Sequence, residues 1–178
     1  MTTFVGADIG NWHVKELKPV RGESIPFASH LQIEDHPTST PTTGIWKLRG
    51  FVSNIRYTNH SERKKILAVQ EGLGRPQATC AALIPIRKNE AWWNLAQDER
   101  RAIFEEQSHH TAIGLHYLPA ISRKLYHCRD IGEPFDFLTW FEYAPTDAAA
   151  FEELVTALRQ TEEWKYVERE VDIRLIKV

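Results

Sequence analysis

The sequence predicts an α+β fold in which an antiparallel sheet carries helices on one face. From Gly44 onward, strand-like and helix-like segments alternate, and the chain ends in a strand. The clearest helix, TDAAAFEELVTALRQTEEW, places four apolar residues on one side at i, i+3, i+4 and i+7 spacing, namely Phe151, Leu154, Val155 and Leu158. In the final segment, EREVDIRLIKV, apolar and charged residues alternate, which is typical of a strand with one buried face.

The N-terminal part predicts mainly strands. Residues 1–43 contain two strand-like segments, NWHVKELKPV and ASHLQIED, which we expect to form one hairpin before the Pro/Thr-rich loop DHPTSTPTTG. GIWKLRGFVSNIRYT predicts a long or bent strand, because it is rich in β-branched and aromatic residues and partly alternates. HSERKKILAVQEGLG predicts a helix that begins at the N-cap candidate Ser61 and ends at Gly72 or Gly74.

The C-terminal part predicts two further strands and one long helix. ATCAALIPIRK is a nearly continuous apolar run, which indicates a strand buried on both faces. We expect the long helix to begin near Asn94, an N-cap candidate with Gln97 at the capping-box position, and to end near Leu118, before Pro119. The following AISRKLYHC is compatible with a second helix or an extended arm, and DFLTWFEY predicts a strand.

Composition excludes several classes of protein. The 178 residues are 42% hydrophobic and 26% charged, which is ordinary for a globular domain and excludes a disordered chain. The net charge of -2 provides no basic field for nucleic acid or an anionic membrane. The longest clean apolar run, CAALIPI, is too short to span a bilayer, and the N-terminus does not resemble a signal peptide, so we expect a cytoplasmic protein.

Cysteine and aromatic content narrow the expectations further. Cys80 and Cys128 lie in unrelated contexts, which favours two reduced thiols over a disulfide. Aromatic residues make up 11% of the chain and include six Trp. This excess indicates either a large apolar cavity or a large interface.

The segment HHTAIGLHYLPAISRKLYHCRDIG contains four of the eight histidines. On a helix, His110 shares an apolar face with Ile113 and Gly114, so it should point inward. Such a histidine is either a hydrogen-bonded core residue or a ligand, and Gly114 leaves room for a flat molecule. Glu106 and His109 also fit the E-x-x-H spacing of a di-iron helix, but the sequence has no second E-x-x-H helix to complete such a centre.

Two long segments resemble the chlorite dismutase family of haem proteins. They are AWWNLAQDERRAIFEEQSHHTAIGLHYLPAISRKLYHCRDIGEPFDFLTWFEYAP and AFEELVTALRQTEEWKYVEREVDIRL. The resemblance is carried by W-W, H-T-x-x-x-L-x-Y-L, R-K-L-Y-H and D-F-x-T-x-F-E in this order, and it covers nearly the whole C-terminal half. It implies a ferredoxin-like dimeric α+β barrel. It also implies a single domain over 1–178, with a shortened N-terminal half (1–87) and a haem-binding C-terminal half (88–178).

The resemblance further implies haem b as cofactor and the decomposition of chlorite to chloride and O2. In that reaction an oxygen atom passes to ferric iron and then recombines with retained hypochlorite. The short chain resembles the lineage whose members are homodimers. His110, which opens H-T-x-x-x-L-x-Y-L, would be the proximal iron ligand, and Arg123, which opens R-K-L-Y-H, the distal catalytic arginine. Glu163 would accept a hydrogen bond from His110, or Glu162 if the alignment slips by one residue.

Four more positions are implied to be near the haem. Trp92 matches a tryptophan beside it, Lys88 a basic residue near its edge and propionates, Gln70 a variable distal position, and Tyr57 could reach a propionate. The chemistry of the main residues is coherent in itself. A carboxylate that accepts from a ligating imidazole fixes the ring and raises its basicity, whereas arginine keeps its charge and offers a rigid fork of donors to a small anion such as chlorite.

Alternatives to chlorite chemistry stay open. The same fold could handle coprohaem, although the longer relatives that do so lack the distal arginine, or it could act as a peroxidase-like haem protein. A barrel without cofactor could serve as an interaction or small-ligand module. The ordinary interpretations are a surface ion pair for Arg123, core packing for Trp92 and Trp93, and a solvated helix end for Glu163.

Overall fold

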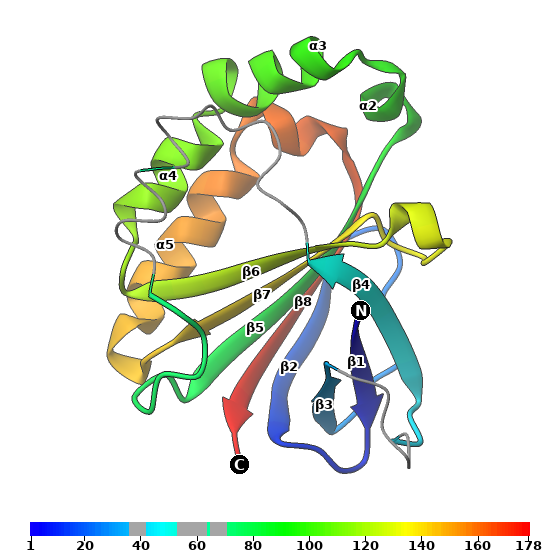
Figure 1. Ribbon diagram of the computed structural model, residues 1–178, viewed down its shortest axis with the longest axis vertical. Helices are drawn as coiled ribbons and strands as arrows, with labels where there is room; N and C mark the ends of the chain where they lie inside the picture. Colours follow the sequence, from blue (N-terminus) through cyan, green and yellow to red (C-terminus); the bar gives the residue numbers. More distant parts are fainter. Residues whose placement is uncertain (36–41, 53–63, 65–70) are drawn as a thin grey trace.

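A computed structural model describes residues 1–35, 42–52, 64 and 71–178. Within these ranges, eight strands form a closed antiparallel barrel in the order β1-β3-β2-β8-β5-β7-β6-β4 (Figure 1). Their bounds are β1 (Thr2–Ala7), β2 (Trp12–Arg21), β3 (His30–Glu34), β4 (Trp46–Val52), β5 (Cys80–Lys88), β6 (Ile121–His127), β7 (Phe137–Tyr143) and β8 (Val167–Lys177). The predicted α+β class is therefore confirmed.

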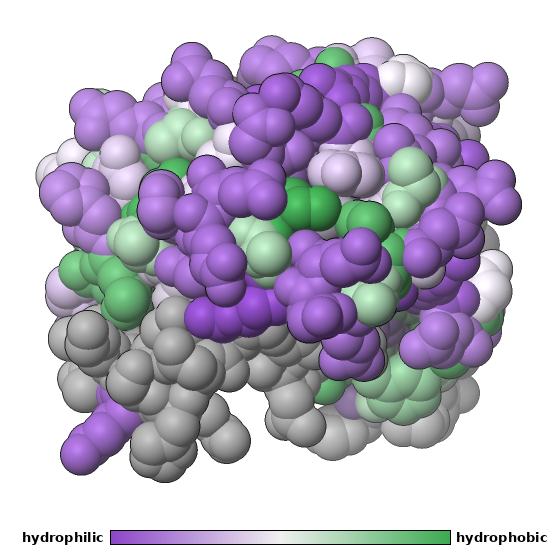
Figure 2. All heavy atoms as spheres, turned by 90° about the horizontal axis from the view of Figure 1, so that it is seen from above, coloured by the Kyte–Doolittle hydropathy of each residue, from purple (hydrophilic) through white to green (hydrophobic). Residues whose placement is uncertain are grey.

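Two of the helices cover one side of this barrel, as predicted. Helices α4 (His110–His116) and α5 (Ala148–Arg159) run beside β5, β6 and β7, whereas α2 (Glu90–Asn94) and α3 (Gln97–Arg101) lie beyond one end (Figure 1). Seen from that end, the surface is mainly hydrophilic with small apolar patches (Figure 2), and no residue of α3 is buried. None of the described helices is both long and apolar enough to cross a membrane.

Two apolar cores follow from this arrangement. One fills the barrel and includes Phe4, Leu83 and Trp140. The other lies between the sheet and the helices. The predicted apolar face of α5 forms part of this second core, because Phe151, Leu154, Val155 and Leu158 are all buried.

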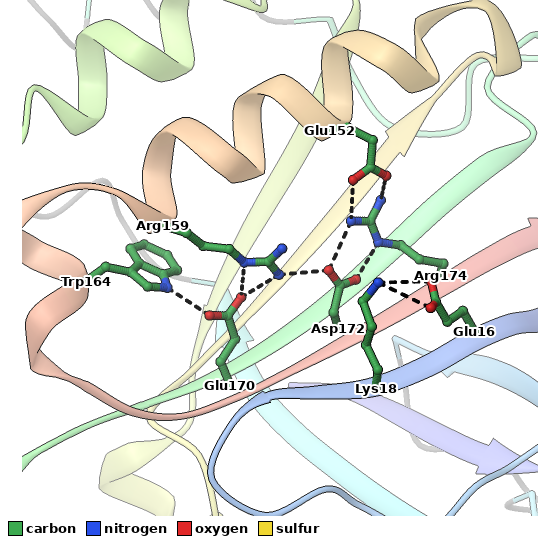
Figure 3. Close-up of polar contacts among 8 residues, drawn as sticks. All are labelled: Glu16, Lys18, Glu152, Arg159, Trp164, Glu170, Asp172 and Arg174. Carbon is green, nitrogen blue, oxygen red and sulfur yellow. Dashed lines mark hydrogen bonds and ion pairs between the residues drawn. The ribbon is translucent and has the colours of Figure 1, made fainter.

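Strand β8 differs from the predicted half-buried strand. Val171, Ile173 and Leu175 face the barrel interior as expected, but Asp172 on the other face is also fully buried, with 0% exposure. The reason is that this face lies beneath α5. Arg159 of α5 reaches across, and its Nη2 lies 2.7 Å from Asp172 Oδ2 (Figure 3). Both faces of β8 are therefore buried, one by apolar packing and one by ion pairs.

The predicted long helix from Asn94 to Leu118 is wrong. The structure has instead α2, α3, a π-helix η1 (Ala102–Gln107) that continues α3 directly, and α4. Asn89 rather than Asn94 caps the first of them, by accepting a hydrogen bond from the backbone of Trp92. The last break lies at His109, whose φ of 51° places it in the left-handed region. Helical periodicity persists across such breaks, because the chain returns to a helical conformation after each of them.

The N-terminal prediction also needs correction. The two expected strands, β2 and β3, pair only at Trp12–Leu31 and His13–His30, whereas β3 pairs mainly with β1 and β2 mainly with β8. Strand β1 was not predicted, because TTFVGA is short and does not alternate. The segment AISRKLYHC, which was compatible with a helix or an extended arm, is extended and contains β6.

Candidate functional site

His110 is the first residue of α4, and its ring is held from two sides. Nδ1 lies 2.7 Å from Oε2 of Glu163. Because a carboxylate only accepts, the imidazole donates this hydrogen bond. Phe104 of η1 stacks on the ring, with centroids 4.3 Å apart and planes inclined by 22°. The ring is thus fixed with Nδ1 occupied, which leaves Nε2 as the nitrogen that can bind a metal.

The break between η1 and α4 sets the position of His110. Ser108 N–H donates to the carbonyl of Ile103 at 3.1 Å, which closes the last π-type turn. Glu105 then accepts from the backbone N–H of Thr111 at 2.8 Å and so caps the first turn of α4. A new helix therefore begins at His110 itself.

Glu163 lies on the 3₁₀ turn η4 (Glu162–Tyr166) and is 5% exposed. Its Oε1 accepts a hydrogen bond from Lys88 Nζ at 2.8 Å, while Oε2 faces His110. Burial alone would raise the pKa of Glu163, but the charges of Lys88 and His110 and their hydrogen bonds outweigh it and lower this pKa to about 2. Glu163 is therefore an ionised acceptor at every pH of interest.

The two candidate glutamates have different surroundings. Glu162 is exposed and pairs with Lys165 at 2.7 Å, three residues along the chain. Glu163 alone of the two contacts His110. The residue implied by the direct alignment is thus the one that the structure places on the histidine.

Lys88 contacts Glu163 at the oxygen away from His110, and Trp92 packs against Lys88. Lys88 is 4% exposed and Trp92 1%, and Lys88 Nζ lies 4.5 Å from the centroid of the Trp92 ring. Tyr166 packs against Trp92, with ring centroids 5.4 Å apart. The structure thus pairs Lys88 with Glu163, a contact that sequence reasoning did not foresee.

Arg123 approaches from the sheet. It lies on β6 opposite Phe141 of β7, a residue of the core between sheet and helices. A Cβ on Gly114 of α4 would lie 3.4 Å from Arg123 Nη1. Gly114 is four residues after His110 and therefore on the same face of α4. Burial lowers the pKa of Arg123, yet a guanidinium stays charged at neutral pH.

These residues together fit a haem site. A histidine with one nitrogen on a buried carboxylate is the donor expected beneath a haem iron. One turn along, the helix face carries Gly114, and the guanidinium of Arg123 faces that glycine from the sheet. Tyr57 and Gln70, the other two candidates, lie outside the described residues.

The di-iron alternative finds no support. Glu106 and His109 are both exposed, and in the described parts of the chain no three His, Cys, Asp or Glu side chains gather closely enough to hold a metal ion. A haem iron needs only one protein ligand, so His110 alone can serve.

Comparisons with known proteins point to one family. A sequence model of the family described as chlorite dismutase matches residues 35–176. A chlorite dismutase of Ideonella dechloratans is 38% identical over 86 residues, which are 48% of this chain and only 28% of that protein. The chain thus spans little more than a quarter of this relative.

Solved structures extend the likeness to the whole fold. A crystal structure of dimeric chlorite dismutases from Nitrobacter winogradskyi has a TM-score of 0.93 and 60% identity, with 100% of both chains covered. A chlorite dismutase of Candidatus Nitrospira defluvii in complex with imidazole has a TM-score of 0.61 and 28% identity, and the match covers 84% of this chain and 57% of that one. With the family model matched over residues 35–176, the chain belongs to the chlorite dismutase family.

Proposed function

We propose that this protein binds haem b and decomposes chlorite to chloride and O2, so that both oxygen atoms leave together. One observation carries the proposal. His110, bonded to Glu163 at 2.7 Å, lies on the same helix face as Gly114, which faces the guanidinium of Arg123. The names of the relatives from Ideonella dechloratans and Nitrobacter winogradskyi support the same substrate.

The helix side of the site would hold the iron. His110 would bind it through Nε2, while its Nδ1 proton stays on the hydrogen bond to Glu163. Because Glu163 is ionised, it draws this proton toward itself and increases the electron density on the ring. A more basic imidazole stabilises iron in higher oxidation states. Trp92 and Lys88 close the rear of the site and exclude water from the pair.

The sheet side holds the anion. The chemistry that a bound haem supplies here is the transfer of an oxygen atom taken from chlorite. Arg123 attracts chlorite by its charge and orients it with its planar donors. It would then retain the hypochlorite that remains when chlorite has given up one oxygen atom, so that the second oxygen can be recovered as O2 and chloride released. Without this retention, hypochlorite would escape and oxidise the protein.

We also propose that the chain forms a homodimer. The relative from Nitrobacter winogradskyi, described as dimeric, matches this chain over its full length at 60% identity. A dimer of about twice 20.6 kDa in light scattering at micromolar concentration is expected.

An O2 electrode tests the reaction directly. Chlorite is added to haem-reconstituted protein at mildly acid pH, and O2 release in proportion to chlorite is expected. Arg123→Ala should keep the Soret band and lose most of the O2 release, whereas Arg123→Lys retains a charge and is the matched control. Bound haem without O2 would move the function to peroxidase-like or coprohaem-handling chemistry. Failure to bind haem would leave only the cofactor-free barrel.

A further inference from the structure

We infer that Ser108 is a positioning residue for the iron ligand, because its hydroxyl holds Glu163 in the place where Glu163 meets His110. Ser108 is 3% exposed, and its Oγ accepts a hydrogen bond from the backbone N–H of Glu163 at 2.8 Å. This inference rests on the proposed haem function, but the contact itself belongs to the protein alone.

The turn η4 needs an acceptor at this point. The first backbone N–H groups of a helical turn have no partner within it. Thr161, the N-cap residue of η4, does not cap it with its side chain, since its hydroxyl donates to the carbonyl of Leu158 at 2.7 Å. A buried N–H without an acceptor is unfavourable. Ser108, from a different segment, supplies the missing acceptor and thereby fixes the backbone of Glu163.

Ser108 is itself held in place. Its own N–H donates to the backbone carbonyl of Ile103 at 3.1 Å, and the N–H of His109 donates to the backbone carbonyl of Glu105 at 2.9 Å. His109 then takes a left-handed conformation, which non-glycine residues rarely adopt. Ser108 and His110, whose hydroxyl and imidazole both contact Glu163, are therefore only two residues apart.

Two links therefore join this segment to Glu163. One is Ser108 Oγ to the backbone N–H, and the other is His110 Nδ1 to Oε2 at 2.7 Å. The second link controls the basicity of the imidazole, and it depends on the distance and angle between ring and carboxylate. Loss of the first link leaves the backbone of Glu163 free to move, so the second should weaken.

The test compares three variants of the haem-loaded protein. Ser108→Ala removes the hydroxyl, and Ser108→Thr keeps it. Thr2→Val is the matched control, since Thr2 is 4% exposed and its hydroxyl donates to Asp35 at 2.7 Å. Thr2 lies on β1, well away from α4 and α5 (Figure 1). It therefore reports what the loss of a buried hydroxyl does to the fold alone.

The main readout is the iron–histidine stretching band of the ferrous protein in resonance Raman spectra. Ser108→Ala should lower its frequency and accelerate haem transfer to apomyoglobin about tenfold. Ser108→Thr should restore both values toward the wild type, and Thr2→Val should lower the melting temperature without moving the band. A band at the wild-type frequency in Ser108→Ala would overturn the inference and leave Ser108 a structural residue.

A further variant of Ser108 and a measurement on the haem-free protein distinguish the proposed effect from misfolding. Ser108→Cys has a similar shape but is a poor acceptor, so it should shift the band in the same direction as Ser108→Ala. In the haem-free protein, the amide of Glu163 should exchange with solvent faster in both variants, and unchanged exchange would overturn the inference. Failure of the proposed function looks different, because the wild type itself would then show no Soret band.

Discussion

Lys88 Nζ lies 2.8 Å from Glu163 Oε1, so one carboxylate serves both a buried lysine and the histidine expected to bind iron. Both side chains of this ion pair are almost inaccessible, at 3% and 7% exposure. Two donors therefore compensate one buried negative charge. The position of Lys88 at the end of β5 couples the sheet to the helix that carries the ligand.

Lys88→Met should destabilise the protein strongly. The substitution keeps the length of the side chain but leaves Glu163 with one donor, and breaking a buried ion pair costs about 3–5 kcal/mol. Urea unfolding of the haem-free protein at pH 7 measures this loss. Lys165→Met removes a lysine from the exposed pair with Glu162 and should change stability by less than about 1 kcal/mol. Similar losses in both variants would contradict the buried pair.

Gly114→Ala should separate stability from haem binding. The new Cβ would lie 3.4 Å from the Arg123 guanidinium, which a flexible side chain can accommodate by a small shift. Alanine favours a helix over glycine by about 1 kcal/mol, so the haem-free protein should become slightly more stable. The methyl group would occupy space in which the haem is expected, so haem affinity should fall by about tenfold or more.

The control for this prediction is Gly72→Ala, since a Cβ there would meet nothing within 4 Å. Haem titration followed at the Soret band measures both variants. If Gly114→Ala bound haem as tightly as Gly72→Ala, the haem would not lie against this face of α4.

Sequence patterns were sufficient to predict an element where its apolar residues pack against a single core. α5 and the inner face of β8 were predicted because their apolar residues recur at the helical and strand periods. Asp172 was misjudged because alternation shows that a residue lies on the second face of a strand but not what covers that face. β1 was missed because its pairing with β3 and β4 is a long-range property of the closed barrel.

The same limit applies to the prediction of site residues from the sequence. His110 and Arg123 could be proposed from the sequence because family motifs mark them, and Gly114 because of its spacing from His110. Nothing in the sequence singled out Ser108, since a serine before two histidines is common and its partner is 55 residues away. The break at His109 likewise depends on the hydrogen bonds made by Ser108 and Thr111, which a periodic apolar pattern does not reveal.

Stability should fall steeply in acid because of Asp172. Burial alone would raise the pKa of Asp172, but hydrogen bonds and charges from Arg174 and Arg159 lower it (Figure 3). Because this pKa is lower in the folded state, the ionised carboxylate stabilises the fold at pH values above the unfolded-state pKa of about 3.9. This stabilisation is lost as the pH falls through the folded-state pKa. Urea unfolding at pH 7, 4 and 3 measures this slope.

Asp172→Asn should flatten the acid part of this profile and lower stability at pH 7 by about 3 kcal/mol, because two arginines lose their shared partner. Asp130→Asn, at an exposed position, is the control and should leave the profile unchanged. A profile for Asp172→Asn as steep as that of the wild type would assign the acid sensitivity to other carboxylates.

Glu163→Gln and Glu162→Gln form the sharpest pair of variants for the ligand site. Glutamine at position 163 keeps the shape but loses the charge, so His110 becomes less basic and Lys88 loses its ionic partner. Haem affinity should fall about 10–100-fold, and the ferrous iron–histidine band should shift to lower frequency. Glu162→Gln changes an exposed carboxylate one residue away and should behave as the wild type. Equal effects of the two substitutions would mean that net charge near η4, and not the contact with His110, controls the iron.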